Sequence, residues 1–376
     1  MLSERVRDLR GSAVRAMLSA AQRPDVISFA GGLPAPDSFA ELDLPAPPAE
    51  LLQYGPTEGE PELRARLSSE LQELGLDAPP ERVLVLSGSQ QGIDLAAKLH
   101  LDRGSGVAVE PFAYLAALQV FRFFGAELQV MDRTDPAGRW SVRTKPRLAY
   151  VTPTFQNPTG HCWSAAERDA LAEACDEQGV TLFEDDPYRD LAYDPCERRP
   201  ICARLRRASW IYQGSLSKTL APGLRLGFLA ASEDLFPHLV NLKQAADLHA
   251  SRIGQWYALR HLEDPDRGTR LTRLVHRYRR RRDAFAASMA KHLSGLADWE
   301  VPAGGLFFWA ALKPGADAGA LLERARRRDV LFTPGEHFLA GPSGPSAAMR
   351  LNFSHADEAA AERGLAILAE LLRSPN

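Results

Sequence analysis

Short apolar runs and longer amphipathic stretches alternate along the chain from about residue 60 to residue 232. The short runs predict buried strands, because turn residues end them before a helical repeat develops. The predicted strands are Val83–Leu86, Gly106–Val109, Glu127–Met131, Leu148–Val151, Val180–Phe183, Ser209–Gln213 and Leu226–Ala230. The predicted helices are Pro61–Leu74, Ile93–Leu101, Tyr114–Phe124 and Ser164–Glu177. This alternation is typical of an α/β fold, with helices flanking a mainly parallel central sheet.

The pattern changes after about residue 232. Helices, the first of them one helix or a pair, are predicted at Leu235–Leu262, Leu271–Leu293, Ala318–Arg327 and Asp357–Leu372. Strands are predicted near 306–309 and at Met349–Phe353, so this part is predicted to be a smaller α+β domain. We therefore expect a large domain at 46–265 and a small C-terminal domain at 266–376. An N-terminal arm at 1–45, with an amphipathic helix over 1–20, is expected to pack with the small domain.

Composition narrows the class of protein. The chain has 376 residues, 45% of them hydrophobic, and a net charge of −3, so it can bury a large core and has no broad basic field for nucleic acid. The basic run Arg277–Arg282 is interpreted as the solvated face of a long helix rather than a phosphate or nucleic-acid patch. No apolar stretch has the length of a membrane span or the form of a signal peptide. The four cysteines form no C-x-x-C pair, which favours reduced thiols in a cytoplasmic protein.

The stretch 214–227 carries the strongest chemical signal. Ser215 and Ser217 stand three and one residues before Lys218, and Arg225 follows seven residues later, between two predicted strands. Hydroxyls and an arginine can grip a phosphate, while the lysine amine stays free to form a Schiff base. The alternative interpretation is a serine- and glycine-rich loop with a solvated lysine.

Other polar motifs also follow predicted strands. Residues 87–92 join a strand to a helix N-terminus, where free N–H groups and the helix dipole favour an anion, although the motif is neither a P-loop nor G-x-G-x-x-G. Residues 152–160, which contain Asn-Pro-Thr-Gly, and residues 184–188 follow two further strands. Because ligands gather at the carboxyl ends of parallel strands, these motifs are expected to form one site.

Six motifs, each weak alone, occur in the order found in one enzyme family. The sequence resembles a fold-type I aminotransferase that uses pyridoxal 5′-phosphate (PLP), and most resembles the class I group of 2-aminoadipate aminotransferase and kynurenine aminotransferase II. The same domain occurs in MocR-type regulators. The resemblance extends from Ile27–Pro34 to Arg350–Phe353, nearly the whole chain. It implies a fold-type I PLP-dependent transferase in which residues 46–265 bind the cofactor.

The resemblance implies three catalytic residues: Lys218, Asp185 and Tyr188. Lys218 would form the Schiff base and later move a proton, since burial and nearby positive charge would lower the pKa of its amine. Asp185 would pair with the pyridine nitrogen and keep it protonated, so that PLP can act as an electron sink. The three-residue step to Tyr188 assigns this role to Asp185 rather than to Asp186.

The resemblance also implies the remaining cofactor contacts. Tyr114 would lie over the pyridine ring, and Asn157 and Tyr188 would bond the phenolic oxygen. Tyr54 would reach the phosphate of the neighbouring subunit, which implies a homodimer with shared active sites. The residues implied to hold the phosphate within one chain are Ser89, Gln90, Ser215, Ser217 and Arg225.

The substrate contacts implied by the resemblance begin with Arg350, whose planar fork suits an α-carboxylate. Asn157 would lie beside the substrate, and Gly32 with the N-terminal segment would close over it. Arg15 matches a position where some relatives bind a distal carboxylate of the substrate.

The expected function is an aminotransferase that moves an amino group from an L-α-amino acid to a 2-oxo acid, with 2-oxoglutarate as the expected acceptor. The route implied by the resemblance uses a Lys218 internal aldimine and a pyridoxamine intermediate. The donor stays open among 2-aminoadipate, aromatic or branched amino acids, and kynurenine. Two alternatives are another PLP reaction on this fold, namely a β-lyase, decarboxylase or racemase, and a non-catalytic MocR-type sensing domain. The short stretch before Ile27 disfavours the regulator, and no metal, nucleic acid or membrane partner is expected.

Overall fold

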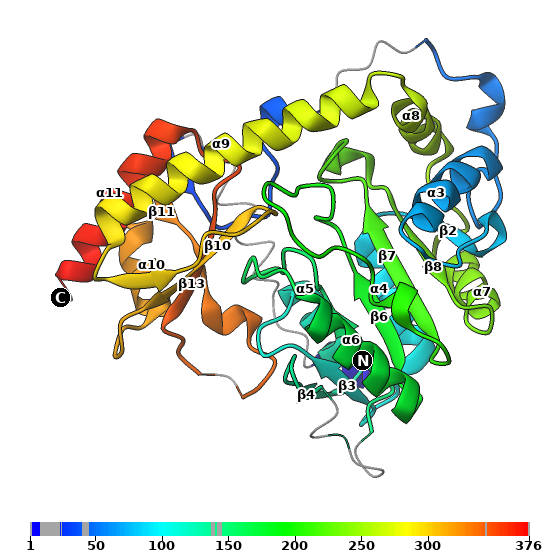
Figure 1. Ribbon diagram of the computed structural model, residues 1–376, viewed down its shortest axis with the longest axis horizontal. Coiled ribbons are helices and arrows are strands. Elements are labelled where there is room, and N and C mark those ends of the chain that lie inside the picture. The colour runs from blue at the N-terminus through cyan, green and yellow to red at the C-terminus, as the bar shows by residue number, and fades with distance from the viewer. Residues whose placement is uncertain are drawn as a thin grey trace.

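Three β-sheets organise the part of the chain that the computed structural model describes, which is residues 2–7, 23, 25–39, 45–136, 140, 145–342 and 344–374. Figure 1 shows the largest sheet with its helices on one side and a smaller group of strands and helices on the other. The long helix α9 (Arg267–Leu293) extends from α8 (Arg252–Glu263) to this smaller group. The predicted domain boundaries stay a prediction.

The largest sheet has seven strands in the order β2-β8-β7-β6-β5-β3-β4. Strand β8 is antiparallel to both neighbours, and the other neighbouring pairs are parallel, which confirms a mainly parallel sheet. The direction of β8 follows from its connection, because residues 216–226 contain no crossover helix of the kind that a parallel pair needs. The strands are β2 Val83–Leu86, β3 Gly106–Val109, β4 Glu127–Val130, β5 Leu148–Val151, β6 Thr181–Asp185, β7 Trp210–Ser215 and β8 Gly227–Ala231.

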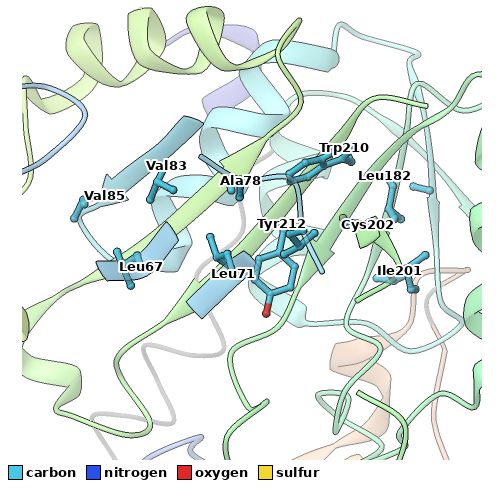
Figure 2. Packing of buried hydrophobic residues seen from close by; sticks show 14 of the residues in the cluster. Leu67, Leu71, Ala78, Val83, Val85, Leu182, Ile201, Cys202, Trp210 and Tyr212 are labelled. Atoms are coloured by element: carbon cyan, nitrogen blue, oxygen red, sulfur yellow. The ribbon is translucent and has the colours of Figure 1, made fainter. Parts of the chain in front are cut away.

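Helices cover both faces of this sheet, so most of its strands are apolar on both sides. Figure 2 shows Leu67 and Leu71 of α3 beside Val83 and Val85 of β2 and Tyr212 of β7. The leucines of β2 belong instead to the core beneath α4, α5 and α7. Besides α8, the helices are α3 Pro61–Glu73, α4 Ser89–His100, α5 Leu115–Phe123, α6 Ala165–Gln178 and α7 Phe236–Asp247.

The second sheet is antiparallel, in the order β12-β13-β10-β9, and shares a core with α9, α10 and α11. The third sheet joins β1 (Ile27–Ser28) to β11 (Val330–Leu331) in parallel, so the N-terminal segment lies beside the C-terminal part of the chain. The other elements here are β9 Ala297–Trp299, β10 Phe307–Leu312, α10 Ala318–Arg326, β12 Thr333–Pro334, β13 Ala348–Asn352 and α11 Glu358–Arg373. The Asp317 side chain caps α10 by accepting from the backbone N–H groups of Gly319 and Ala320.

Most predicted elements are confirmed to within a few residues. Helix α4 begins at Ser89 rather than Ile93, which brings the polar motif into its first turn. The stretch 235–262 forms a pair of helices, α7 and α8. Of the predicted N-terminal helix, the structure describes α1 (Glu4–Arg7), and the rest lies outside the described residues. Short 3-10 helices lie at Pro36–Ser38, Ala49–Leu52, Pro80–Arg82, Cys202–Arg204, Pro222–Leu224 and Gly335–Phe338.

The basic run on α9 is only partly a solvated face. Arg277 and Arg281 pair with Asp37, at 3.5 and 3.2 Å. The interpretation of the run as a solvated helix face is wrong for Arg282. This residue is 4% exposed and donates to the carbonyl oxygen of Pro302 at 2.9 Å. The reason is helical spacing, because residue 282 lies one turn from the buried residue 278, on the core side of the helix. Among the described residues, no helix is long and apolar enough to cross a membrane.

Candidate active site

The predicted site residues gather at one cavity of about 270 Å³, at the carboxyl ends of the parallel strands. Its lining comes from strands β6, β7 and β13, from the N-terminus of α4, from Thr152 directly after β5 and from the segment 30–33. The predicted residues that line it are Gly32, Ser89, Gln90, Tyr114, Asn157, Asp185, Tyr188, Ser215, Ser217, Lys218, Arg225 and Arg350.

One end of the cavity is built to receive an anion. Ser89 and Gln90 occupy the first turn of α4, where free backbone N–H groups and the helix dipole favour negative charge. The guanidinium of Arg225 lies so close to Gly88 that a Cβ there would collide with it, and Gly88 has a φ of +86°. Arg225 itself has a φ of +51°. The loop after β7 therefore holds the arginine against the helix N-terminus, and a phosphate group fits this combination.

Lys218 lines the same cavity as this anion site. Its Nζ donates a hydrogen bond to the carbonyl oxygen of Gly32 at 2.8 Å, and lies 6.0 Å from the centre of the Tyr188 ring. Burial, followed by the charges of Arg350 and Arg225, lowers the pKa of Lys218 to about 8. An appreciable fraction of the amine is therefore unprotonated near neutral pH, as a nucleophile or a base requires.

Asp185 is 4% exposed and lines the cavity at the end of β6. It accepts hydrogen bonds from the Tyr150 hydroxyl at 2.8 Å and from Gln213 Nε2 at 2.9 Å. Both partners are neutral, and burial raises the pKa of Asp185 to about 6. Asp186 instead accepts from the Tyr212 hydroxyl at 3.0 Å, because successive side chains leave a strand on opposite faces. A cationic ring nitrogen beside Asp185 would supply the missing positive charge.

Arg350, 3% exposed, is a buried cation with neutral polar partners. Its Nη1 donates to Asn157 Oδ1 at 2.6 Å, and its Nη2 donates to the carbonyl oxygen of Ala30 and to Thr333 Oγ1 at 3.3 Å. In the described part of the chain, its Nε has no hydrogen-bond partner. Burial lowers the pKa of Arg350 to about 10. A buried guanidinium without a carboxylate favours binding of an anionic ligand group.

Two aromatic rings position this guanidinium. Its central carbon lies 4.3 Å from the ring centre of Phe307 and 4.9 Å from that of Phe338. Asn157, which accepts from this guanidinium, also donates weakly from Nδ2 to the Tyr188 hydroxyl at 3.5 Å. Asn157 thus joins the buried arginine to the tyrosine predicted to bond the cofactor.

Of the predicted site residues that the structure describes, one is not in the cavity lining. Tyr54 is 75% exposed, and its ring makes an edge-on contact with His249, with 5.9 Å between ring centres. Arg15 lies outside the described residues.

The two residues that hold Asp185 were not among the predicted site residues. Tyr150 and Gln213 are 1% and 0% exposed and belong to neighbouring parts of the sheet. Their signal was a polar group inside an otherwise apolar predicted strand, close to its carboxyl end. A buried polar group of this kind requires a partner, which here is the carboxylate.

These residues fit PLP. The anion site suits its phosphate, the buried carboxylate suits its pyridine nitrogen, and a lysine amine lines the same cavity. Fold and site together define a fold-type I, PLP-dependent transferase.

Comparison with known proteins agrees with this class. The family model described as "Aminotransferase class I and II" matches residues 47–368. A 2-aminoadipate transaminase of Thermus thermophilus is 34% identical, over 97% of this chain and 94% of its own length. An aromatic-amino-acid aminotransferase of Thermococcus litoralis is 33% identical, over 99% and 94%.

A solved structure is also similar over nearly its full length. It is an α-aminoadipate aminotransferase of Thermus thermophilus, complexed with N-(5′-phosphopyridoxyl)-L-leucine. The two structures superpose with a TM-score of 0.87 at 31% sequence identity, and the match covers 99% of this chain and 97% of that one. The chain belongs to the class I and II aminotransferases. It is an enzyme that transfers amino groups, and its cofactor is PLP.

Proposed function

We propose that this aminotransferase takes the amino group of an L-α-amino acid in the cavity around Lys218 and passes it to 2-oxoglutarate. The observation that carries the proposal is Arg350, a buried guanidinium with neutral partners in the same cavity as the lysine amine. Amino acids and 2-oxo acids share a carboxylate next to the reacting carbon, so one arginine can orient both.

The residues would divide the chemistry as follows. PLP, when bound, supplies a protonated ring that withdraws electrons from the substrate Cα. Asp185 would keep the ring proton in place, and its low exposure would strengthen this pairing. Lys218 would take the proton from the substrate Cα and deliver it to the cofactor C4′, since its lowered pKa makes the free amine accessible. Asn157 and Tyr188 would hold the phenolic oxygen, and Tyr114 would stack on the ring.

The phosphate would be held by Arg225 and the first turn of α4, with the hydroxyls of Ser215 and Ser217. Support comes from the arrangement itself, because Ser215 Oγ accepts from the Ser217 backbone N–H at 3.2 Å, and both residues line the cavity. Gly32, whose carbonyl oxygen accepts from Lys218, would lie over the substrate. Arg15 is proposed, on the family resemblance alone, to read a distal carboxylate.

We propose a homodimer in which Tyr54 reaches the phosphate of the neighbouring subunit. The 75% exposure of Tyr54 leaves its hydroxyl available to a partner. Mixed dimers test this: a wild-type chain is combined with a Lys218→Ala chain that either keeps Tyr54 or carries Tyr54→Phe, and PLP affinity is compared at the active lysine site. An unchanged affinity when the partner carries Tyr54→Phe would count against a shared site. The cytoplasmic location, like the domain boundaries, stays a prediction.

The proposed reaction is tested with purified protein loaded with PLP. An L-amino acid donor should abolish the visible band of bound PLP, and 2-oxoglutarate should restore it while glutamate and the donor's 2-oxo acid form in equal amounts. Pyruvate with ammonia, or carbon dioxide, would instead indicate a lyase or decarboxylase. A panel of 2-aminoadipate, kynurenine, aromatic and branched amino acids then ranks the donors by kcat/KM.

A further inference from the structure

Two cysteines far apart in sequence lie together beside the active-site loop. Cys162 follows Asn157 by five residues, and Cys196 lies in the segment between β6 and β7. The Cys162 thiol donates a hydrogen bond to the carbonyl oxygen of Glu197, the residue next to Cys196, at 3.2 Å. The Cys196 thiol lies within hydrogen-bonding reach of the Cys162 sulfur. Both side chains are partly exposed, so a small reagent can reach them.

A buried arginine completes this cluster. The Nη2 of Arg168, which is 0% exposed, lies 3.9 Å from the Cys162 sulfur. The same nitrogen donates to the Glu197 carbonyl oxygen at 3.0 Å and to Thr154 Oγ1 at 3.1 Å, so it ties the loop that carries Asn157 to the segment that carries Cys196. The Glu184 carboxylate also pairs with this guanidinium, with 3.7 Å between Arg168 Nη1 and Glu184 Oε1. A cation at this place stabilises a thiolate.

The two thiols are not equivalent. The hydrogen bond from Cys196, together with the charge of Arg168, lowers the pKa of Cys162 to about 7 against the effect of burial. The same contact raises the pKa of Cys196, because Cys196 is the thiol that donates its proton to the Cys162 sulfur. Of the two thiols, Cys162 therefore loses its proton more readily than Cys196. The other two cysteines, Cys175 and Cys202, are buried, and burial raises the pKa of both.

We propose that Cys162 and Cys196 form a peroxide-sensitive dithiol, in which Cys162 reacts first and Cys196 closes a disulfide. The Cys162 thiolate attacks one peroxide oxygen, so an S–O bond forms, the O–O bond breaks, and the leaving hydroxide takes a proton to become water. The Cys196 sulfur then attacks the Cys162 sulfur, the S–S bond forms, and the hydroxyl leaves as a second water with the Cys196 proton. In total, two thiols are oxidised and one peroxide is reduced. The disulfide would link the loop of Asn157 to the segment 194–199.

The test uses the PLP-loaded protein, purified with reductant and then desalted. After hydrogen peroxide treatment, free thiols are alkylated and the protein is digested without reduction for mass spectrometry. We expect a Cys162–Cys196 cross-linked peptide that disappears with dithiothreitol, while Cys175 and Cys202 remain reduced. In the Cys196→Ser variant, peroxide should oxidise Cys162 to a sulfenic acid, which dimedone labels. In the Cys162→Ser variant, peroxide should leave Cys196 largely unmodified.

Cys202→Ser is the matched control, and it should form the cross-link at the wild-type rate. Cys196→Ala repeats the first variant if the serine disturbs the fold, and thermal melting shows that each variant is folded. Three results would overturn the proposal: no cross-link while all four cysteines oxidise at similar rates, a cross-link only between chains, or a sulfenic acid that forms on Cys196 before Cys162.

Discussion

Replacing Arg350 tests the central part of the proposed site. Arg350→Met removes a cation that is 3% exposed, and a bound carboxylate would then lose its charged partner. Breaking a buried, hydrogen-bonded charge pair costs about 3–5 kcal/mol. We therefore expect kcat/KM for an L-amino acid to fall between about 150-fold and about 5000-fold. Arg350→Lys keeps the charge but loses the two parallel hydrogen bonds, and should lose about 10- to 100-fold.

The assay compares each amino acid with the amine that lacks its carboxylate. The wild-type enzyme should strongly prefer the amino acid, and Arg350→Met should lose most of that preference, because only the carboxylate distinguishes the two substrates. Affinity for PLP, measured by spectral titration, should change little. Arg282→Lys is the control, since Arg282 is also buried but lies on α9, outside the cavity lining. An Arg350→Met enzyme that keeps its preference for the carboxylate would refute the assignment.

Three further predictions follow from the same geometry. Asp185→Asn should lower kcat by roughly 100- to 1000-fold while PLP stays bound, because the amide carries no charge to hold the ring proton. Stopped-flow spectroscopy with a single amino acid donor measures the rate. A near-normal kcat would contradict the pairing of Asp185 with the ring nitrogen. Since burial lowers the pKa of Lys218 to about 8, the folded PLP-free protein binds fewer protons than the unfolded chain from about pH 8 to the usual lysine range near 10.5. Its stability should therefore rise with pH across this window, and chemical denaturation should show that Lys218→Met lacks this rise and is more stable below pH 8. Gly88→Ala should cost about 1–3 kcal/mol of unfolding free energy and weaken PLP binding, because a Cβ there collides with Arg225 at a φ of +86°. Gly104→Ala, at a φ of +82° in open space, is its matched control and should leave the PLP dissociation constant unchanged.

The large sheet could be predicted from local pattern because both of its faces are buried. Each strand is then a short apolar run that stands out between amphipathic helices. The paired two-residue strands β1 and β11 could not be predicted, since two residues show no periodicity and form a strand only when a distant partner is present. The antiparallel direction of β8 could not be predicted from its own residues either, because it depends on the connection from β7, which has no crossover helix.

The sequence by itself determined the chemistry available at the site. The order of the motifs identified the lysine, the anion-binding turns and the arginine of residues 350–353, and the structure brings them to one cavity. The lysine and the anion-binding turns follow strands of the large sheet and meet at one edge of it, as the fold class implies, whereas Arg350 comes from β13 of the antiparallel sheet.

Only the tertiary structure decided the electrostatics. Asp185, and not Asp186, lines the cavity, and it does so with two neutral hydrogen-bond donors from β5 and β7. The lowered pKa of Lys218 and the contact of Cys162 with Cys196 also depend on segments far away in the sequence. The physical reason is that a residue type fixes which groups can ionise, whereas burial and the charges brought near by folding fix the energy of each ionised form.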